Sequence, residues 1–188
     1  MTDRILTTHV GSLPRPDPVV DVLFSQERDE GHDPARVNDL LQQGVNDVVR
    51  MQAEAGLDIV SDGEMSKISY ATYIRHRLTG FDGDSPRPTP QDLDDFPQLR
   101  DRLVTEGHSP TYRRPVCTGP VGTKACAPLA SDIARLKRAL AESEAAGSGA
   151  AAAFMTAVSP GTIGVFHPNQ YYRSHGAYMH AVGAAMRV

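Results

Sequence analysis

The sequence has few cysteines, no concentrated basic stretch and no long apolar run, and each absence excludes a class of protein. Only Cys117 and Cys126 are present, and their spacing matches neither a CxxC zinc knuckle nor a disulfide framework. The net charge is -4, and no Lys/Arg cluster supplies the basic stripe that a nucleic-acid surface needs. No apolar run is long enough to cross a bilayer. We therefore expect two reduced, structural thiols and no nucleic-acid or membrane partner.

What is present favours one globular domain. The chain has 188 residues, of which 40% are hydrophobic, and this is enough for a single domain over residues 1–188 with a sizeable core. The segment Met1 to Leu6 lacks the apolar region of a signal peptide. A cytoplasmic location is the resulting expectation.

The stretch Gly56 to Glu64 combines an apolar run with two acidic residues. A short, β-branched apolar run leads directly into Asp62, Gly63 and Glu64, which is typical of a buried parallel strand that ends in acids. Gly63 lets the backbone turn, so both carboxylates can project from the carboxyl end of the strand, where parallel α/β proteins bind ligands. The alternative is that Asp62 caps the next helix and Glu64 is simply solvated.

A second polar loop follows the first expected strand. Ile5 to Thr8 is β-prone, and the run His9 to Pro16 then breaks regular structure with glycine and prolines. Gly11 and Ser12 offer backbone N–H groups and a hydroxyl to a carboxylate or another anion. His9 fits either a ligand or catalytic role or a hydrogen-bonded structural role.

Periodicity predicts helices over residues 33–56, 66–78, 127–146 and 174–187, with Asp33 as the N-cap of the first. Further strands are expected at 115–117, which contains Cys117, and at 150–158. Residues 80–114 show no sustained period and are expected to form a long loop excursion. Polar residues at the strand ends extend the candidate pocket, which comprises His9, Asp62, Thr118, Gly119 and Ser159.

This order corresponds to about four β-α units, with a polar segment after each strand. The simplest closed architecture of that kind is a (β/α)8 TIM-type barrel, which typically needs about 250 residues. The fold class is therefore α/β, either as a partial (β/α)8 barrel belonging to a longer protein or as an open flavodoxin-like sheet.

Four separated stretches carry a family resemblance: residues 7–16, 56–64, 117–121 and 154–162. Together they resemble the cobalamin-independent methionine synthase family. The similarity is greatest to the N-terminal half of its single-barrel members, labelled methionine synthase II or 5-methyltetrahydropteroyltriglutamate–homocysteine methyltransferase. The resemblance implies a barrel that transfers a methyl group from methyltetrahydrofolate to a thiol, with zinc holding that thiol as thiolate.

The resemblance also implies roles for single residues. Val10, Gly11 and Ser12 match the loop that holds the amino-acid end of homocysteine, and Glu64 matches the carboxylate that pairs with its ammonium group. The family's zinc ligands match nothing in this chain, and we expect His9, Cys117 and Cys126 not to replace them. No catalytic residue and no metal ligand is therefore assigned.

These observations predict a chain that carries part of a methyl-transfer site and is catalytically silent on its own. One alternative is alkyl transfer to another thiol, as in epoxyalkane–coenzyme M transferases. A second is a non-catalytic half-barrel that acts as a binding or assembly module. Because the edges of a parallel sheet should not remain bare, we expect a homo-oligomer or pairing with a second half. A truncated reading frame without function is the remaining alternative.

Overall fold

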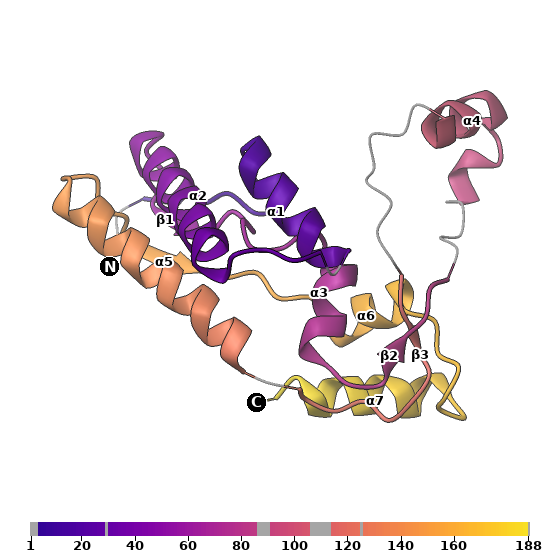
Figure 1. The fold of residues 1–188 in the computed structure, drawn as a ribbon. Coiled ribbons are helices and arrows are strands. Elements are labelled where there is room, and N and C mark those ends of the chain that lie inside the picture. Colours follow the sequence, from indigo (N-terminus) through magenta and orange to yellow (C-terminus); the bar gives the residue numbers. More distant parts are fainter. Residues whose placement is uncertain (1–3, 29, 86–90, 106–113, 125, 188) are drawn as a thin grey trace.

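The computed structural model describes residues 4–28, 30–85, 91–105, 114–124 and 126–187. Its central feature is a short run of parallel pairing. Strand β1 (Ile59–Ser61) pairs in parallel with β4 (Ala152–Phe154), and Thr8 forms a parallel bridge to Ile59 on the other side. The order across this unit is therefore the N-terminal segment, β1 and β4. Figure 1 shows β1 beside the helices α2 and α5.

Helix α2 (Pro34–Glu54) confirms the predicted first helix. Asp33 is its N-cap, and the side chain accepts a hydrogen bond of 3.0 Å from the Ala35 N–H. The helix leads through a turn at Gly56 into β1, and Thr8 and Ile59 bridge in parallel. The parallel order of the expected β-α-β unit is therefore present, but residues 5–8 contribute an isolated bridge at Thr8 in place of the predicted strand.

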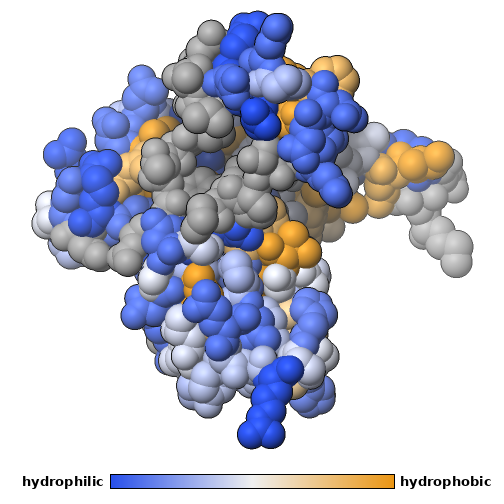
Figure 2. Space-filling model, turned by 90° about the vertical axis from the view of Figure 1, so that its right-hand side faces the viewer, coloured by the Kyte–Doolittle hydropathy of each residue, from blue (hydrophilic) through white to orange (hydrophobic). Residues whose placement is uncertain are grey.

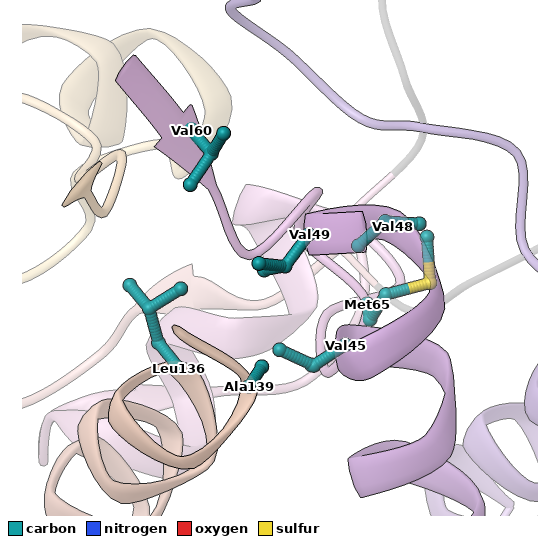
Figure 3. Packing of buried hydrophobic residues seen from close by; sticks show 7 residues of the cluster. All are labelled: Val45, Val48, Val49, Val60, Met65, Leu136 and Ala139. Atoms are coloured by element: carbon teal, nitrogen blue, oxygen red, sulfur yellow. The ribbon is translucent and has the colours of Figure 1, made fainter. Parts of the chain in front are cut away.

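The core beside β1 is made by three elements. Val45 and Val49 of α2 lie toward Leu136 and Ala139 of α5 (Ala127–Ala145), whereas Val48 lies beside Met65 (Figure 3). Val60 of β1 completes the cluster. All seven side chains are buried, because the apolar stripes of α2 and α5 pack against each other and against β1. This packing holds the end of β1 in place.

Three further helices pack at two different places, α1 on α2 and α6 and α7 in a second buried cluster. Helix α1 (Asp17–Glu27) packs on α2 through Val19 and Leu23, and the sequence patterns did not predict it. Helix α7 (His175–Ala185) agrees with the last predicted helix, with Ser174 as its N-cap. Helix α6 (Pro160–Phe166) packs against α7 and was also not predicted.

The prediction of a further parallel strand at 115–117 is wrong. Strand β3 (Val116–Cys117) pairs antiparallel with β2 (Phe81–Asp82) in a separate two-stranded sheet. The backbones approach closely here: a Cβ on Gly80 would lie 2.6 Å from the Gly119 carbonyl oxygen, and Gly80 has a φ of 84°. The described strands thus form two short pairs, of which only β1–β4 is parallel. Isolated parallel bridges add Thr8 beside β1 and Asn169 beside Cys117, so four successive parallel strands are not formed among the described residues.

Two further boundaries differ from the prediction. Helix α3 (Tyr70–Arg77) begins later than residue 66, because residues 63–66 form a turn. The predicted excursion joins β2 to β3 and contains the 3-10 helix η1 (Gln91–Leu93) and helix α4 (Pro97–Thr105). Residues 86–90 and 106–113 of that excursion lie outside the described residues. Figure 1 shows α4 set apart from the other helices.

On the face drawn in Figure 2, hydrophilic colours dominate and orange gathers in a few separate patches. Within the described ranges, every helix is too short or too polar to span a membrane.

The buried cluster gives a direct test of the packing. Met65 is fully buried and packs against α2 at Gly44, where an added Cβ would lie 3.5 Å from the Met65 sulfur. Met65→Ala should therefore lower the free energy of unfolding by about 2–4 kcal/mol, because it removes these contacts and leaves a cavity. Urea denaturation measures this change. Met51→Ala is the matched control, because Met51 is 57% exposed and its loss should leave stability nearly unchanged. Equal effects of the two substitutions would contradict the packing described here.

Candidate functional site

The candidate site begins where β1 ends in a left-handed turn. Gly63 has a φ of 59°, and a Cβ there would lie 3.1 Å from Val48 and 3.3 Å from Leu13. Glu64 follows with a φ of 57°, a conformation that non-glycine residues seldom adopt. Such backbone strain concentrates at functional sites, where surrounding contacts maintain it. The turn therefore marks Glu64 as a candidate functional residue.

The Glu64 carboxylate lies where three chain segments meet. Its Oε2 accepts a hydrogen bond of 2.6 Å from the Ser12 hydroxyl, and its Oε1 accepts one of 2.9 Å from Thr156. Glu64 is only 5% exposed, whereas Ser12 is exposed and Thr156 half-buried. The carboxylate thus lies just beneath a solvent-accessible rim. The alternative in which Glu64 is simply solvated is wrong.

A second layer of charges lies behind Glu64. Asp62, which is 2% exposed, accepts a hydrogen bond of 3.1 Å from the Glu64 N–H through Oδ1. Its Oδ2 lies 3.3 Å from the ammonium of Lys67, which is buried too. The Arg15 guanidinium donates to the backbone carbonyls of Glu64 and Lys67. Asp62 therefore stabilises the turn itself instead of capping the next helix.

Arg15 is the cation of the N-terminal loop. Burial lowers its pKa, and the nearby carboxylates of Glu64 and Asp62 act in the opposite direction. Two carboxylates and two cations, Lys67 and Arg15, thus surround the turn. Their balance lets the acids be buried without leaving an uncompensated charge.

Asp58 attaches the N-terminal segment to β1. Its carboxylate accepts hydrogen bonds from the Arg4 guanidinium and from the backbone N–H and hydroxyl of Thr7. These contacts, with that of Arg4 largest, lower the pKa of Asp58 to about 2. They fix the strand that leads into the loop containing Ser12.

The N-terminal loop reaches the turn as predicted. Leu13 donates a backbone hydrogen bond of 3.1 Å to the Gly63 carbonyl, and Ser12 contacts Glu64. Gly11 has a φ of 110°, and Val10 is 68% exposed. The Nε2 atom of His9 is buried without a hydrogen-bond partner among the described residues. Ser12, Asp62 and Glu64 are therefore brought together, with Val10 and Gly11 on the same loop.

Three other predicted pocket residues have partners elsewhere. The backbone N–H groups of Thr118 and Gly119 donate to the Gly80 carbonyl at 2.9 and 3.3 Å, within the second sheet. The expected free N–H groups at that strand end are thus occupied. Ser159 is the N-cap of α6, where its hydroxyl accepts a hydrogen bond of 3.1 Å from the Thr162 N–H.

The cysteines and histidines do not gather. Cys117 is buried in β3, where burial raises the pKa of its thiol, whereas Cys126 is exposed at the start of α5. Burial lowers the pKa of His167, which contacts the Pro115 carbonyl at 2.8 Å. In the part of the chain that the structure describes, no three His, Cys, Asp or Glu residues lie close enough to hold a metal ion. These residues do not fit a zinc site.

Sequence reasoning missed three contributors to the site: Thr156, Arg15 and Lys67. Thr156 was part of a motif without a role, and only its alignment after β4 brings it to Glu64. Lys67 lies within the helix predicted over residues 66–78, but the helix begins only at Tyr70, so Lys67 belongs to the segment before it. The sequence did contain a signal for both cations. Arg15 lies between two prolines in the N-terminal loop, and Lys67 follows Glu64 by three residues.

An apolar groove of about 570 Å³ borders the site. It runs along β4 and the segment that follows it, between α5 and α3, and it shares Thr156 and Lys67 with the site. Its walls are mostly aliphatic, and Ile133 of α5 is 38% exposed.

The part of the chain that contains Ser12 and Glu64 is similar in sequence to known proteins. Residues 5–85 match the family described as "Cobalamin-independent synthase, Catalytic domain", and this range contains both Ser12 and Glu64. A methionine synthase from Sulfolobus acidocaldarius is 36% identical over 89 residues, which are 43% of this chain and 24% of that protein. Residues 5–85 are thus similar in sequence to the catalytic domain of cobalamin-independent methionine synthases.

A solved member of this family shares the fold. The B12-independent methionine synthase of a Shewanella species, determined in complex with selenomethionine, superposes with a TM-score of 0.55 at 18% identity. The match covers 96% of this chain and 48% of the Shewanella protein. The chain thus spans about half of that synthase and about a quarter of the Sulfolobus one.

The Asp58 anchor predicts a pH dependence of stability. Because folding lowers the pKa of Asp58 from 3.8 to about 2, its contribution is full above pH 4 and is lost as the pH falls toward 2. Asp58→Asn should flatten this part of the curve of unfolding free energy against pH, measured by urea denaturation. Asp39→Asn, on the exposed side of α2, is the control and should leave the slope unchanged. An unaltered slope in Asp58→Asn would rule out this anchor.

Proposed function

We propose that the rim formed by Ser12, Glu64 and Thr156 binds the amino-acid end of a homocysteine-like thiol. The buried Glu64 carboxylate, held by two hydroxyls, carries this proposal. In it, Glu64 pairs with the substrate ammonium, and the loop at Val10, Gly11 and Ser12 receives the substrate carboxylate. A carboxylate beside a loop that offers backbone N–H groups complements a zwitterion.

The reaction we propose for the complete site is methyl transfer from a folate, methyltetrahydrofolate, to that thiol. Holding the substrate by its ammonium and carboxylate orients the sulfur, and orientation of this kind lowers the barrier of a two-reactant step. The described residues do not fit a zinc site, so the zinc that the family implies would be held by other residues, where it would stabilise the substrate sulfur as a thiolate. This chain contributes binding and orientation, and we propose that it is catalytically silent alone.

The buried Glu64 carboxylate should also discriminate between two kinds of acceptor thiol, an amino-acid thiol and coenzyme M. Coenzyme M carries a sulfonate and no ammonium group, so Glu64 would repel it or gain no partner from it. An amino-acid thiol satisfies Glu64 directly. The site therefore favours a homocysteine-like acceptor over the coenzyme M type.

The test is binding of L-methionine, measured by isothermal titration calorimetry. Glu64→Gln removes the charge that pairs with the ammonium while keeping the size of the side chain, so affinity should fall at least about tenfold. The control is Glu54→Gln, because Glu54 is 60% exposed at the end of α2. The deaminated analogue 4-(methylthio)butanoate lacks the ammonium group, so it should bind wild type and Glu64→Gln equally. Equal methionine affinity in wild type and Glu64→Gln would refute the proposed role.

A second proposal concerns assembly. We propose that the chain is part of a (β/α)8 barrel and that, without a second half, another copy covers the groove beside β4. The apolar groove and the exposed Ile133 support this, since the edge of a parallel sheet favours burial. The resulting homo-oligomer would occupy the surface on which a second half would pack.

Sedimentation velocity at increasing concentration tests the assembly. Wild type should self-associate, and Ile133→Asp should shift the equilibrium toward monomer because a charge enters the apolar groove. Leu99→Asp on α4, where Leu99 is 45% exposed, is the control and should not. A wild-type monomer at every concentration would count against this proposal.

A further inference from the structure

Lys67 is a buried cation that lies behind the proposed substrate site. Its side chain is only 5% exposed, and its Nζ lies 3.3 Å from Asp62 Oδ2. On its other side the ammonium lies 5.5 Å from the centre of the Tyr73 ring. Lys67 thus sits between an acid and an aromatic face, one layer away from Glu64.

The Tyr73 ring is itself fixed. Its hydroxyl donates a hydrogen bond of 2.7 Å to Asp132 of α5 and accepts one of 3.0 Å from Arg77. Burial, with Asp132 adding to it, raises the pKa of Tyr73 to about 12, so the hydroxyl keeps its proton. The ring therefore offers Lys67 a stationary wall that is held from both α3 and α5.

Asp62 connects Lys67 to the substrate site. One carboxylate oxygen faces Lys67, and the other accepts the hydrogen bond of 3.1 Å from the Glu64 N–H. With Oδ2 held, Asp62 cannot rotate away from the Glu64 amide. Asp62 is thus one of the groups that contact the turn in which Glu64 has a φ of 57°, and it is the one that Lys67 contacts.

We infer that Lys67 is a positioning residue, which acts through Asp62 to hold the Glu64 turn in its ligand-binding conformation. This inference rests on the proposed amino-acid site for its functional meaning. The Asp62–Lys67 pair need not add net stability, because replacing both members of a buried ion pair by neutral groups is often close to neutral. The pair fixes an orientation, and this role can be separated from stability by experiment.

The experiment compares wild type with the double variant Lys67→Met/Asp62→Asn. Met keeps an unbranched side chain against the Tyr73 ring, and Asn keeps an acceptor for the Glu64 N–H, so no buried charge is left alone. Three quantities are measured: the thermal midpoint, the hydrogen-exchange rate of the Glu64 amide by NMR, and the affinity for L-methionine.

The double variant should keep a thermal midpoint close to wild type. Exchange at Glu64 should become about fivefold to tenfold faster and methionine affinity should fall by a similar factor, the range expected for one loosened hydrogen bond. Lys67→Arg retains the cation and should keep both wild-type values. If the double variant does not fold, Lys67→Leu/Asp62→Asn, which also leaves no buried charge alone, should change exchange and affinity in the same direction.

Unchanged exchange at Glu64 together with unchanged methionine affinity would overturn the positioning role. The failure of the proposed function looks different: wild type would not bind methionine at all. Faster Glu64 exchange in the variant would then still support the positioning of the turn. Loss of affinity with unchanged exchange would also overturn the inference, because Lys67 would then act on the ligand without acting through Glu64.

Discussion

The site depends on one constraint, the left-handed turn at Gly63 and Glu64. A positive φ at a residue such as Glu costs about 1–3 kcal/mol, so the surrounding contacts must offset that cost. Leu13 binds the Gly63 carbonyl, Arg15 binds the Glu64 carbonyl, and Asp62 binds the Glu64 amide. Relaxing the turn would point the carboxylate elsewhere and break its contacts with the two hydroxyls. The backbone conformation of the turn therefore sets the position of the carboxylate that we propose binds the ligand.

Parallel pairing explains why distant segments meet at that turn. Thr8 lies on one side of β1 and β4 lies on the other, so the residues that follow each strand reach the same end of the sheet. Ser12 and Thr156 come from these two flanks, and Glu64 follows the strand between them. The packing of α2 on α5 beneath β1 keeps the three segments in register.

Features with local causes could be predicted from the sequence. Asp33 and Pro34 start α2 through capping, and the run from Gly56 to Glu64 specifies a strand that ends in acids. Ser12 and Glu64 were singled out by the loop and the turn, and their contact agrees with that reasoning. Placing these candidate residues required only the rule that parallel α/β proteins bind ligands at the carboxyl ends of their strands.

The remainder depends on pairing partners that local sequence does not encode. Val116 and Cys117 are a correct strand, but nothing in their residues states that they pair antiparallel with Phe81 and Asp82. Thr118 and Gly119 were therefore assigned to the wrong strand end. Lys67 likewise has a role only because the turn delays the start of α3 and directs the side chain toward Asp62.

The most direct test of the account is a crystal structure of this chain with L-selenomethionine, whose selenium marks the ligand by anomalous scattering. The account predicts the ligand ammonium at hydrogen-bond distance from the Glu64 carboxylate, with the ligand carboxylate at the loop of Gly11 and Ser12. Selenium at a position with no contact to Glu64, or no bound ligand at saturating concentration, would contradict it.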